Sequence, residues 1–324
     1  MRDTKMATLL ERFVTCAAAA AALASLMPLA ARLGWAFDLA SHFRVQYVVA
    51  DALLAIVLLA RGKLVFSIAL AGCAALSAWA VLPYLAFAPQ VVATAAAGAP
   101  TIKLLAANVL YRNHSPGRLL EIVRRESPDV VLLVEYTPEW AAQVDELRTA
   151  YPHYLERPRS DPYGIALYSR YSLDTARPFA LGDTTAIEAR VRTPDGPLTV
   201  IGVHLRSPMT PARAAMRNLQ LDELAVRVSG TAGPVAVIGD FNLTPYSPFF
   251  ADWLARSGLT DTRRGRTLSP SWPTLLPIAA IPIDHCAVSR DVVVVAHRSL
   301  PAFGSDHYPI LAELKLATPL PSQN

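Results

Sequence analysis

The chain has 324 residues, enough for one large domain and an accessory segment, and 53% of them are hydrophobic. Its mean hydropathy of +0.31 is high for a soluble protein, which indicates a membrane part. The net charge is only +4. The three cysteines are too few for a disulfide framework, which excludes a protein held together by several disulfide bonds.

The charged residues are divided unequally along the chain. Before Pro100 only 11 residues are charged, whereas from Thr101 onward 23 Lys and Arg stand against 22 Asp and Glu. The second part therefore has a net charge of +1 and no strong general basic field for nucleic acid. The first part has the composition of a membrane segment.

Three apolar runs predict membrane-spanning helices. The run from Phe13 to Ala31 is uncharged, and its 19 residues nearly cross a hydrocarbon core of about 30 Å. A second run starts near Phe43 and ends at Ala60, and a third extends from Leu64 to Phe87. A cleaved signal peptide would have a shorter apolar region without further spans. We therefore expect an anchor of about three helices over residues 1–87.

The basic residues near these spans predict their orientation, because Lys and Arg near span ends stay on the cytoplasmic side. They precede the first span and join the second to the third: Arg2, Lys5, Arg12, Arg61 and Lys63. Arg32 and Arg44, in the first loop, oppose this arrangement. We expect a multi-pass protein of the inner (cytoplasmic) membrane, with the domain that follows the spans on the periplasmic side. Asp51, inside the second span, is expected near the interface or in a helix–helix hydrogen bond.

After the spans, residues 88–100 are small, uncharged and rich in Pro and Ala, which is typical of a linker. We expect one folded domain over residues 101–318 and a tail over residues 319–324. Apolar runs predict strands over residues 102–108, 130–135, 165–169, 186–193, 198–204, 235–238, 283–288 and 309–316. Helices are predicted to begin at Ser115-Pro116, where Ser115 would cap the helix, at Thr137-Pro138 and near Pro211. This mixture predicts an α/β or α+β layered sandwich.

Polar residues follow several of the predicted strands. They are Asn108, Glu135, His204, Asp240 with Asn242, and Asp284, with Asp306 and His307 just before the last strand. Each has an ordinary alternative, because a single Asn or Asp after a strand is more often a turn former. The combination of all of them favours one functional site at the edge of the sheets where these strands end.

Three local contexts indicate chemistry at phosphate. Gly239-Asp240-Phe241-Asn242 breaks a buried strand and presents a carboxylate and an amide two residues apart, which could orient a water and a phosphate oxygen. Asp306-His307 and Asp284-His285 each place an acid beside an imidazole, and such an acid can fix the tautomer of a histidine. Glu135 is the hard oxygen ligand that Mg²⁺ or Mn²⁺ requires.

At these residues the chain resembles the endonuclease/exonuclease/phosphatase superfamily, which has a four-layered, DNase I-like α/β sandwich. The matching segments, in chain order, are Asn108, Glu135, residues 164–170, Val203-His204-Leu205, residues 239–242, Ile283-Asp284-His285 and residues 305–309. Only the Gly-Asp-Phe-Asn and Ser-Asp-His-Tyr-Pro segments are specific by themselves. The apolar N-terminal part and Trp272-Pro273-Thr274 are most similar to the bacterial membrane-anchored branch.

The resemblance implies a role for each matching residue. Glu135, with Asn108 and Asp306, would bind Mg²⁺ or Mn²⁺. Asp240 and Asn242 would orient the attacking water and the phosphate. His307, aligned by Asp284, would contact the phosphate or transfer a proton, and His204 would stabilise the pentacovalent intermediate or assist the leaving group.

Three departures from the family pattern concern substrate contacts. Val134 stands where the family has a glutamine, Thr137 where a basic or aromatic residue is found, and His285 where the nuclease branch has a tyrosine. No basic loop of the kind used by duplex-DNA enzymes is inserted.

The favoured hypothesis is a membrane-anchored, metal-dependent hydrolase of phosphodiesters, of the nuclease or phosphodiesterase type. An alternative is a phosphatase or phospholipase-type hydrolase of lipid or inositol phosphate headgroups. A second alternative is a catalytically inactive, membrane-tethered binding module. The expected partners are thus a phosphate-ester substrate, either nucleic acid or a phospholipid headgroup, and the lipid bilayer.

Overall fold

A computed structural model describes residues 2–87 and 98–317. The chain divides into two compact units, Met1–Pro83 with Tyr246–Pro248 and Tyr84–Pro245 with Phe249–Asn324, here called the anchor unit and the α/β unit. Most of the predicted linker and the predicted tail lie outside the described residues.

The anchor unit is helical. Its elements are α1 (Arg2–Leu26), η1 (Met27–Leu33), α2 (Trp35–Ser41), α3 (Arg44–Ala60) and α4 (Leu64–Val81), followed by η2 (Leu82–Tyr84). Two stretches, Glu11–Leu33 and Leu64–Tyr84, are long and apolar enough to cross a membrane. Helices α2 and α3 are bent by 72° relative to each other. If the two helices together form one broken span, the unit has three candidate spans. The expectation of about three spans agrees with this range of two to three.

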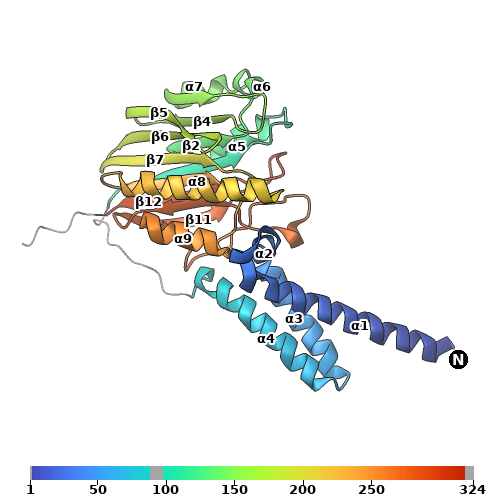
Figure 1. Cartoon of the computed structure of the whole chain (residues 1–324). Helices are drawn as coiled ribbons and strands as arrows, with labels where there is room; N and C mark the ends of the chain where they lie inside the picture. Colours follow the sequence, from blue (N-terminus) through green and yellow to red (C-terminus); the bar gives the residue numbers. More distant parts are fainter. Residues whose placement is uncertain (1, 88–97, 318–324) are drawn as a thin grey trace, which may run out of the picture. The chain divides into compact units, whose positions relative to one another are not determined.

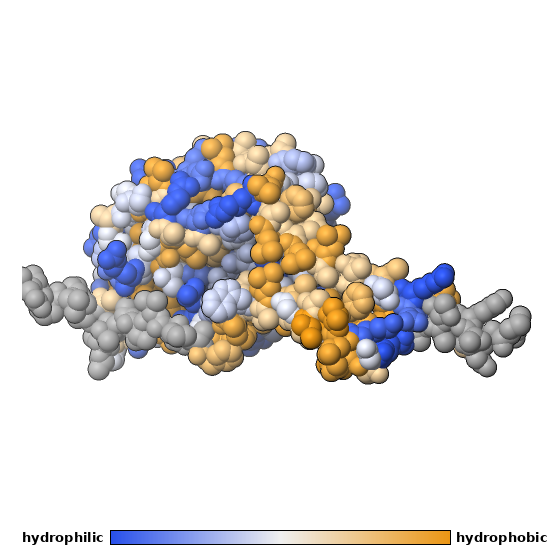
Figure 2. Space-filling view, turned by 60° about the horizontal axis from the view of Figure 1, so that its bottom comes forward, coloured by the Kyte–Doolittle hydropathy of each residue, from blue (hydrophilic) through white to orange (hydrophobic). Residues whose placement is uncertain are grey.

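Two features of the anchor unit suit a membrane. Many large hydrophobic side chains of these helices are exposed, among them Leu53, Val65 and Trp79. Figure 2 shows hydrophobic residues on the helical unit beside a group of hydrophilic ones. Ser25 of α1 donates a hydrogen bond of 2.5 Å to the Asp51 carboxylate of α3, so the one acidic residue inside the second predicted span joins two helices. This is one of the two alternatives expected for Asp51.

The α/β unit contains two six-stranded sheets (Figure 1). Sheet A has the order β11-β12-β1-β2-β4-β3 and sheet B the order β5-β6-β7-β8-β10-β9. Sheet A consists of β1 (Ile102–Asn108), β2 (Val130–Val134), β3 (His153–Arg157), β4 (Ile165–Ser169), β11 (Val292–Ser299) and β12 (Ile310–Leu316). Sheet B consists of β5 (Leu173–Leu181), β6 (Thr184–Thr193), β7 (Gly196–His204), β8 (Val235–Asp240), β9 (Thr260–Asp261) and β10 (Asp284–Val288). Each sheet has one central parallel pair, β1 with β2 and β7 with β8, and its other pairs are antiparallel.

Helices cover the outer faces of both sheets and produce four layers. Apolar residues of α5 (Gly117–Glu126), α6 (Pro138–Ala141) and α7 (Asp145–Ala150) pack on sheet A, and those of α8 (Pro211–Ser229) and α9 (Pro248–Ser257) pack on sheet B. Residues from both sheets share the central core. A Cβ atom on Gly202 of β7 would overlap the side chain of Leu132 of β2, because the sheets approach closely there. The predicted α/β sandwich is confirmed.

The predicted strands are all present, and they are the eight inner strands of the two sheets. The four edge strands β3, β5, β9 and β11, and the helices α7 and α9, were not predicted. The prediction that Ser115 caps the following helix was wrong, because α5 begins at Gly117 without a side-chain cap and the Ser115 amide instead donates to the Asn113 side chain. Thr137 does cap α6, accepting from the amide of Trp140.

Candidate active site

The two parallel strand pairs bring their carboxyl ends to one rim, where most of the predicted residues lie. Asn108 ends β1, Glu135 follows β2, His204 ends β7 and Asp240 ends β8. The antiparallel strand β10 begins at this rim, because Asp284 is opposite Asp240 in the register. The fold therefore gathers these side chains from segments that are far apart in the sequence.

The side chain of Asn108 links the two sheets. Its amide nitrogen donates to the carboxylates of Glu135 and Asp240, each at 3.0 Å, and lies 3.5 Å from Nε2 of His307. Its oxygen accepts from the backbone amide of Leu110 at 3.0 Å. Asn108 was predicted to help bind a metal. In this arrangement it orients two carboxylates, while its oxygen already has a backbone donor.

Glu135 occupies an unusual backbone position directly after β2. Its φ of 59° lies in the left-handed region, which a residue with a side chain adopts only when its surroundings require it. One oxygen of its carboxylate accepts from Asn108 and the other from the amide of Tyr111 at 2.9 Å. The carboxylate is thereby held at the rim in a single orientation.

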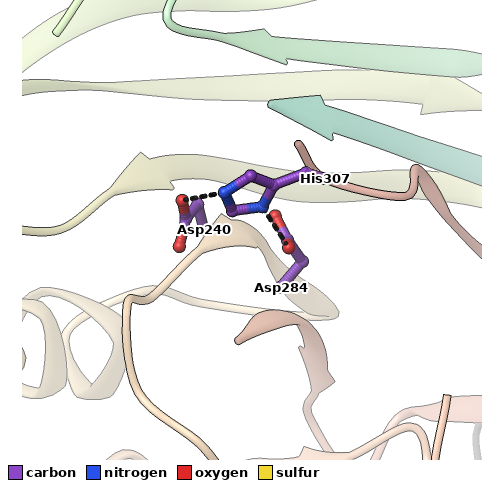
Figure 3. A group of neighbouring side chains, drawn as sticks. All are labelled: Asp240, Asp284 and His307. Atoms are coloured by element: carbon purple, nitrogen blue, oxygen red, sulfur yellow. Dashed lines mark hydrogen bonds and ion pairs between the residues drawn. The ribbon is translucent and has the colours of Figure 1, made fainter. Parts of the chain in front are cut away.

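His307 lies between two carboxylates (Figure 3). Its Nδ1 atom is 2.8 Å from Oδ2 of Asp284, and its Nε2 atom is 3.8 Å from Oδ2 of Asp240. Burial lowers the pKa of His307, but the Asp284 and Asp240 carboxylates outweigh burial and raise the pKa above its ordinary value. Burial and the Asp284 carboxylate likewise raise the pKa of Asp240, against the opposing effect of the two histidines. Asp284 thus holds the imidazole with Nε2 toward the interior of the site.

Asp240 and its neighbour Asn242 are coupled through the backbone. Gly239 has a φ of 141°, and a Cβ atom there would overlap the carbonyl oxygen of Val203, so only glycine fits before Asp240. The amide of Asn242 donates to Asp240 at 2.8 Å, and its side-chain nitrogen donates to the carbonyl of Leu205 at 3.0 Å. That side chain was predicted to orient water and phosphate. In the structure it fixes the loop that carries it, and its role toward water and phosphate stays a prediction.

His204 faces Asp240 from the neighbouring strand, with its Nε2 atom 3.6 Å from Oδ2. Its Nδ1 atom lies 3.0 Å from the carbonyl oxygen of Pro162, which can accept only from a protonated Nδ1. The ring packs on Tyr163, and the Arg206 guanidinium covers the same tyrosine at 4.1 Å from its centroid. Sequence reasoning did not identify Tyr163 or Arg206, because neither lies in a recognisable motif.

Asp306 and the adjacent Ser305 connect the last loop to this rim. The Ser305 hydroxyl donates to the backbone oxygen of Asn108 at 2.7 Å, and the Asp306 carboxylate accepts from the indole nitrogen of Trp272 at 3.0 Å. Among the residues that the structure describes, Asp306 forms no hydrogen bond with its predicted fellow ligands, Glu135 and Asn108. The hydrogen bond from Ser305 to Asn108 brings the loop with Asp306 to the same rim.

A buried polar network beneath the rim was also not predicted. Asp261, Arg263 and His285 are fully buried, and Arg263 contacts both Asp261 and the Nδ1 atom of His285. The Nε2 atom of His285 is 2.7 Å from the carbonyl oxygen of Leu243. The Arg263 guanidinium donates to the carbonyl oxygen of Asp284 at 3.4 Å. Because Asp284 and His285 are consecutive on β10, their side chains point to opposite faces. His285 therefore supports the rim instead of reaching the substrate.

The chemistry of the rim fits a divalent cation. Of the side chains that the structure describes, no lysine or arginine forms an ion pair with Glu135 or Asp306. Glu135, Asp240, Asp284 and Asp306 thus bring four carboxyl groups to a rim with two imidazoles. Ligand atoms of Asp240, Asp284 and His307 also lie within 4.8 Å of one another. We interpret that group as a hydrogen-bonded pair of Asp284 and His307 with Asp240 as a second carboxylate beside it, because Nδ1 of His307 is already bonded to Asp284.

The two-sheet fold and this rim of carboxylates, amides and imidazoles define the class of DNase I-like α/β proteins. The family described as Endonuclease/Exonuclease/phosphatase family matches residues 105–307, more than half of the chain. The chain belongs to this family, and its membership supports a phosphoric ester hydrolase. The resemblance inferred from the motifs is confirmed.

Solved structures agree with this assignment. An endonuclease/exonuclease/phosphatase from Beutenbergia cavernae DSM 12333 is 20% identical, with a TM-score of 0.55 over 67% of this chain and 72% of that chain. A family protein from Bacteroides thetaiotaomicron is 14% identical, with a TM-score of 0.58 over 68% and 99%. D. rerio TDP2, complexed with a single strand DNA product, is 17% identical, with a TM-score of 0.57 over 66% and 99%. At these identities the likeness shows the fold alone. No match was found among curated proteins.

Proposed function

We propose that this protein is a membrane-anchored, divalent-metal-dependent hydrolase of phosphodiester bonds. The observation that carries the proposal is the position of His307, hydrogen-bonded to Asp284 at 2.8 Å while its other nitrogen faces Asp240 and Asn108. Such a group can meet a phosphate or move a proton at one defined atom, Nε2. Relatives of the same fold include one with a bound DNA product, which is a phosphodiester.

Each residue has a proposed task in an in-line displacement at phosphorus. Asp240 accepts a hydrogen bond from the attacking water, and the amide of Asn242 fixes that carboxylate. As the water oxygen bonds to phosphorus, the proton of the water passes to the Asp240 carboxylate and the bond to the leaving oxygen breaks. The leaving oxygen departs with the bonding electron pair and takes a proton from the His204 imidazole or from solvent. His204, with its Nδ1 held by Pro162, would use Nε2 to stabilise the pentacovalent species or to assist the leaving oxygen. His307 would contact a non-bridging phosphate oxygen or transfer a proton.

Glu135 and Asp306, with Asn108 orienting Glu135, would hold Mg²⁺ or Mn²⁺. When bound, the ion would neutralise charge that develops on the phosphate oxygens. Without a cation, the carboxyl groups of the rim would repel an anionic substrate, so the residues present require such a partner.

The anchor gives the proposed enzyme its location. The candidate spans and the placement of basic residues support a multi-pass protein of the inner membrane, with residues 101–318 as a periplasmic catalytic domain. Residues 88–100 would serve as the linker between these parts.

The proposal is tested with the purified full chain in detergent. Hydrolysis of bis-p-nitrophenyl phosphate, p-nitrophenyl phosphate, single-stranded DNA, RNA, sphingomyelin and phosphoinositides should be measured with Mg²⁺, with Mn²⁺ and with EDTA. We expect diester hydrolysis that EDTA abolishes and either metal restores. Activity on monoesters alone would support the phosphatase alternative, and folded protein with no activity would support the binding-module alternative.

A further inference from the structure

An exposed apolar loop lies between β9 and β10 of the α/β unit. Residues 271–282 contain no charged side chain. Within this loop Leu275 is 89% exposed, Leu276 54% and Ile278 84%. The other exposed large hydrophobic residues described after Ile102 are isolated from one another in the sequence: Tyr154, Met209, Leu219, Val226 and Val295. Single exposed hydrophobic residues are ordinary, whereas three within four residues mark a contact surface.

The loop is attached firmly to the active-site rim. At its base Trp272 and Ile281 form an antiparallel bridge, with backbone hydrogen bonds of 3.0 and 2.6 Å. At its side the amide of Thr274 donates to the carbonyl of Asp306 at 2.9 Å, and the indole of Trp272 donates to the Asp306 carboxylate. Whatever surface receives the loop therefore lies close to the segment that carries Asp306 and His307.

The covalent chain limits what that surface can be. Only the twenty residues from Leu82 to Thr101 separate the end of α4 from the start of β1. Even fully extended they span at most about 70 Å, which is not much more than the roughly 45 Å width of a domain of this size. If α4 crosses a membrane, the α/β unit always remains within reach of the bilayer.

We propose that the loop from Trp272 to Ile281 docks on the lipid bilayer and holds the Asp306–His307 segment at the membrane surface. Uncharged Leu, Ile and Pro side chains suit the boundary between headgroups and acyl chains, where a charged side chain would resist insertion. The inference rests on the proposed anchoring but is independent of the proposed chemistry.

The test uses the full chain reconstituted in phosphatidylcholine/phosphatidylglycerol nanodiscs. Cys16 is replaced by alanine, and the two remaining cysteines, Cys73 and Cys286, are buried. An NBD fluorophore is attached to Leu275→Cys or, as the matched control, to Val226→Cys, an exposed residue of α8 in the same unit. Quenching is measured with nitroxide-labelled lipid and with aqueous iodide. We expect severalfold stronger lipid quenching at position 275 than at position 226, and the reverse order for iodide.

A second variant tests the chemistry of the contact. With the fluorophore on Ile278→Cys, the substitution Leu275→Asp should greatly reduce lipid quenching, and it should leave the fold intact because Leu275 is exposed. Equal iodide quenching at positions 275 and 226 without lipid quenching would overturn the proposal. Protection from both quenchers would overturn it as well, because a protein surface would then cover the loop. If the full chain does not co-elute with the nanodiscs in size-exclusion chromatography, the anchoring is wrong and this inference with it.

Discussion

Nδ1 of His307 and the carboxylate of Asp284 lie 2.8 Å apart, although the two residues are 23 positions apart in the sequence. If the pair acts as one unit, His307→Ala should lower turnover by about 10²- to 10⁴-fold, as expected for a positioned proton-transfer group. Asp284→Asn should cause a large share of that loss, and the double variant should be little worse than the worse single variant. Turnover should be corrected for the folded fraction by circular dichroism. Additive losses would contradict the coupled pair.

Glu135 is the residue on which metal binding should depend most. Glu135→Gln keeps the shape of the side chain and removes its charge, so Mg²⁺ or Mn²⁺ affinity should fall by at least about tenfold. Isothermal titration calorimetry measures this loss without relying on activity. The matched control is Glu146→Gln, which removes an exposed carboxylate paired with Arg124 and should leave metal affinity unchanged. Equal affinity in the two variants would refute the role of Glu135.

The α/β unit should fold without the anchor, because both of its sheets and its cores are built from its own residues. Residues 100–324 should be obtained as a soluble, monodisperse protein with cooperative thermal unfolding, monitored by circular dichroism. Aggregation on removal of the anchor would show that the unit depends on it.

His285 should make this unit sensitive to acid. Burial, with the adjacent Arg263 guanidinium, lowers the pKa of His285 to about 4. The unfolded chain then binds a proton that the folded protein does not, so stability should fall as pH decreases from about 6.5 to about 4, by on the order of 3 kcal/mol. Urea unfolding at several pH values should show a shallower decline for His285→Gln, which cannot titrate.

A control separates this effect from general acid denaturation. His114→Gln changes an exposed histidine that does not belong to the buried network, and it should keep the wild-type dependence on pH. If His285→Gln also keeps that dependence, burial of His285 does not control acid stability.

The orientation of the chain in the membrane is predicted from its basic residues. Alkaline phosphatase fused after Asn324 should be active and green fluorescent protein at the same position should be dark, because the catalytic domain is expected outside the cytoplasm. The opposite pattern would place the domain on the cytoplasmic side.

The sequence alone determined the inner strands and most of the rim. Strands such as β1, β2, β4 and β8 are buried on both faces, so they appear as continuous apolar runs that end at a polar residue. The four edge strands were missed because they are partly exposed or, like β9, too short to produce a pattern. Local composition reports burial, and burial is greatest at the centre of a sheet.

Which side chains touch was decided by the tertiary structure. The order and spacing of the motifs pointed to Asp284, but not to the face of β10 that meets the rim, and its neighbour His285 turned out to lie in a buried network with Asp261 and Arg263. That choice depends on how the two sheets stack, since alternate residues of a strand face opposite sides. Likewise, the hydrogen bond from Asn108 of β1 to Asp240 of β8 joins strands of different sheets. No local pattern encodes such a contact, because it exists only once both sheets have packed against each other.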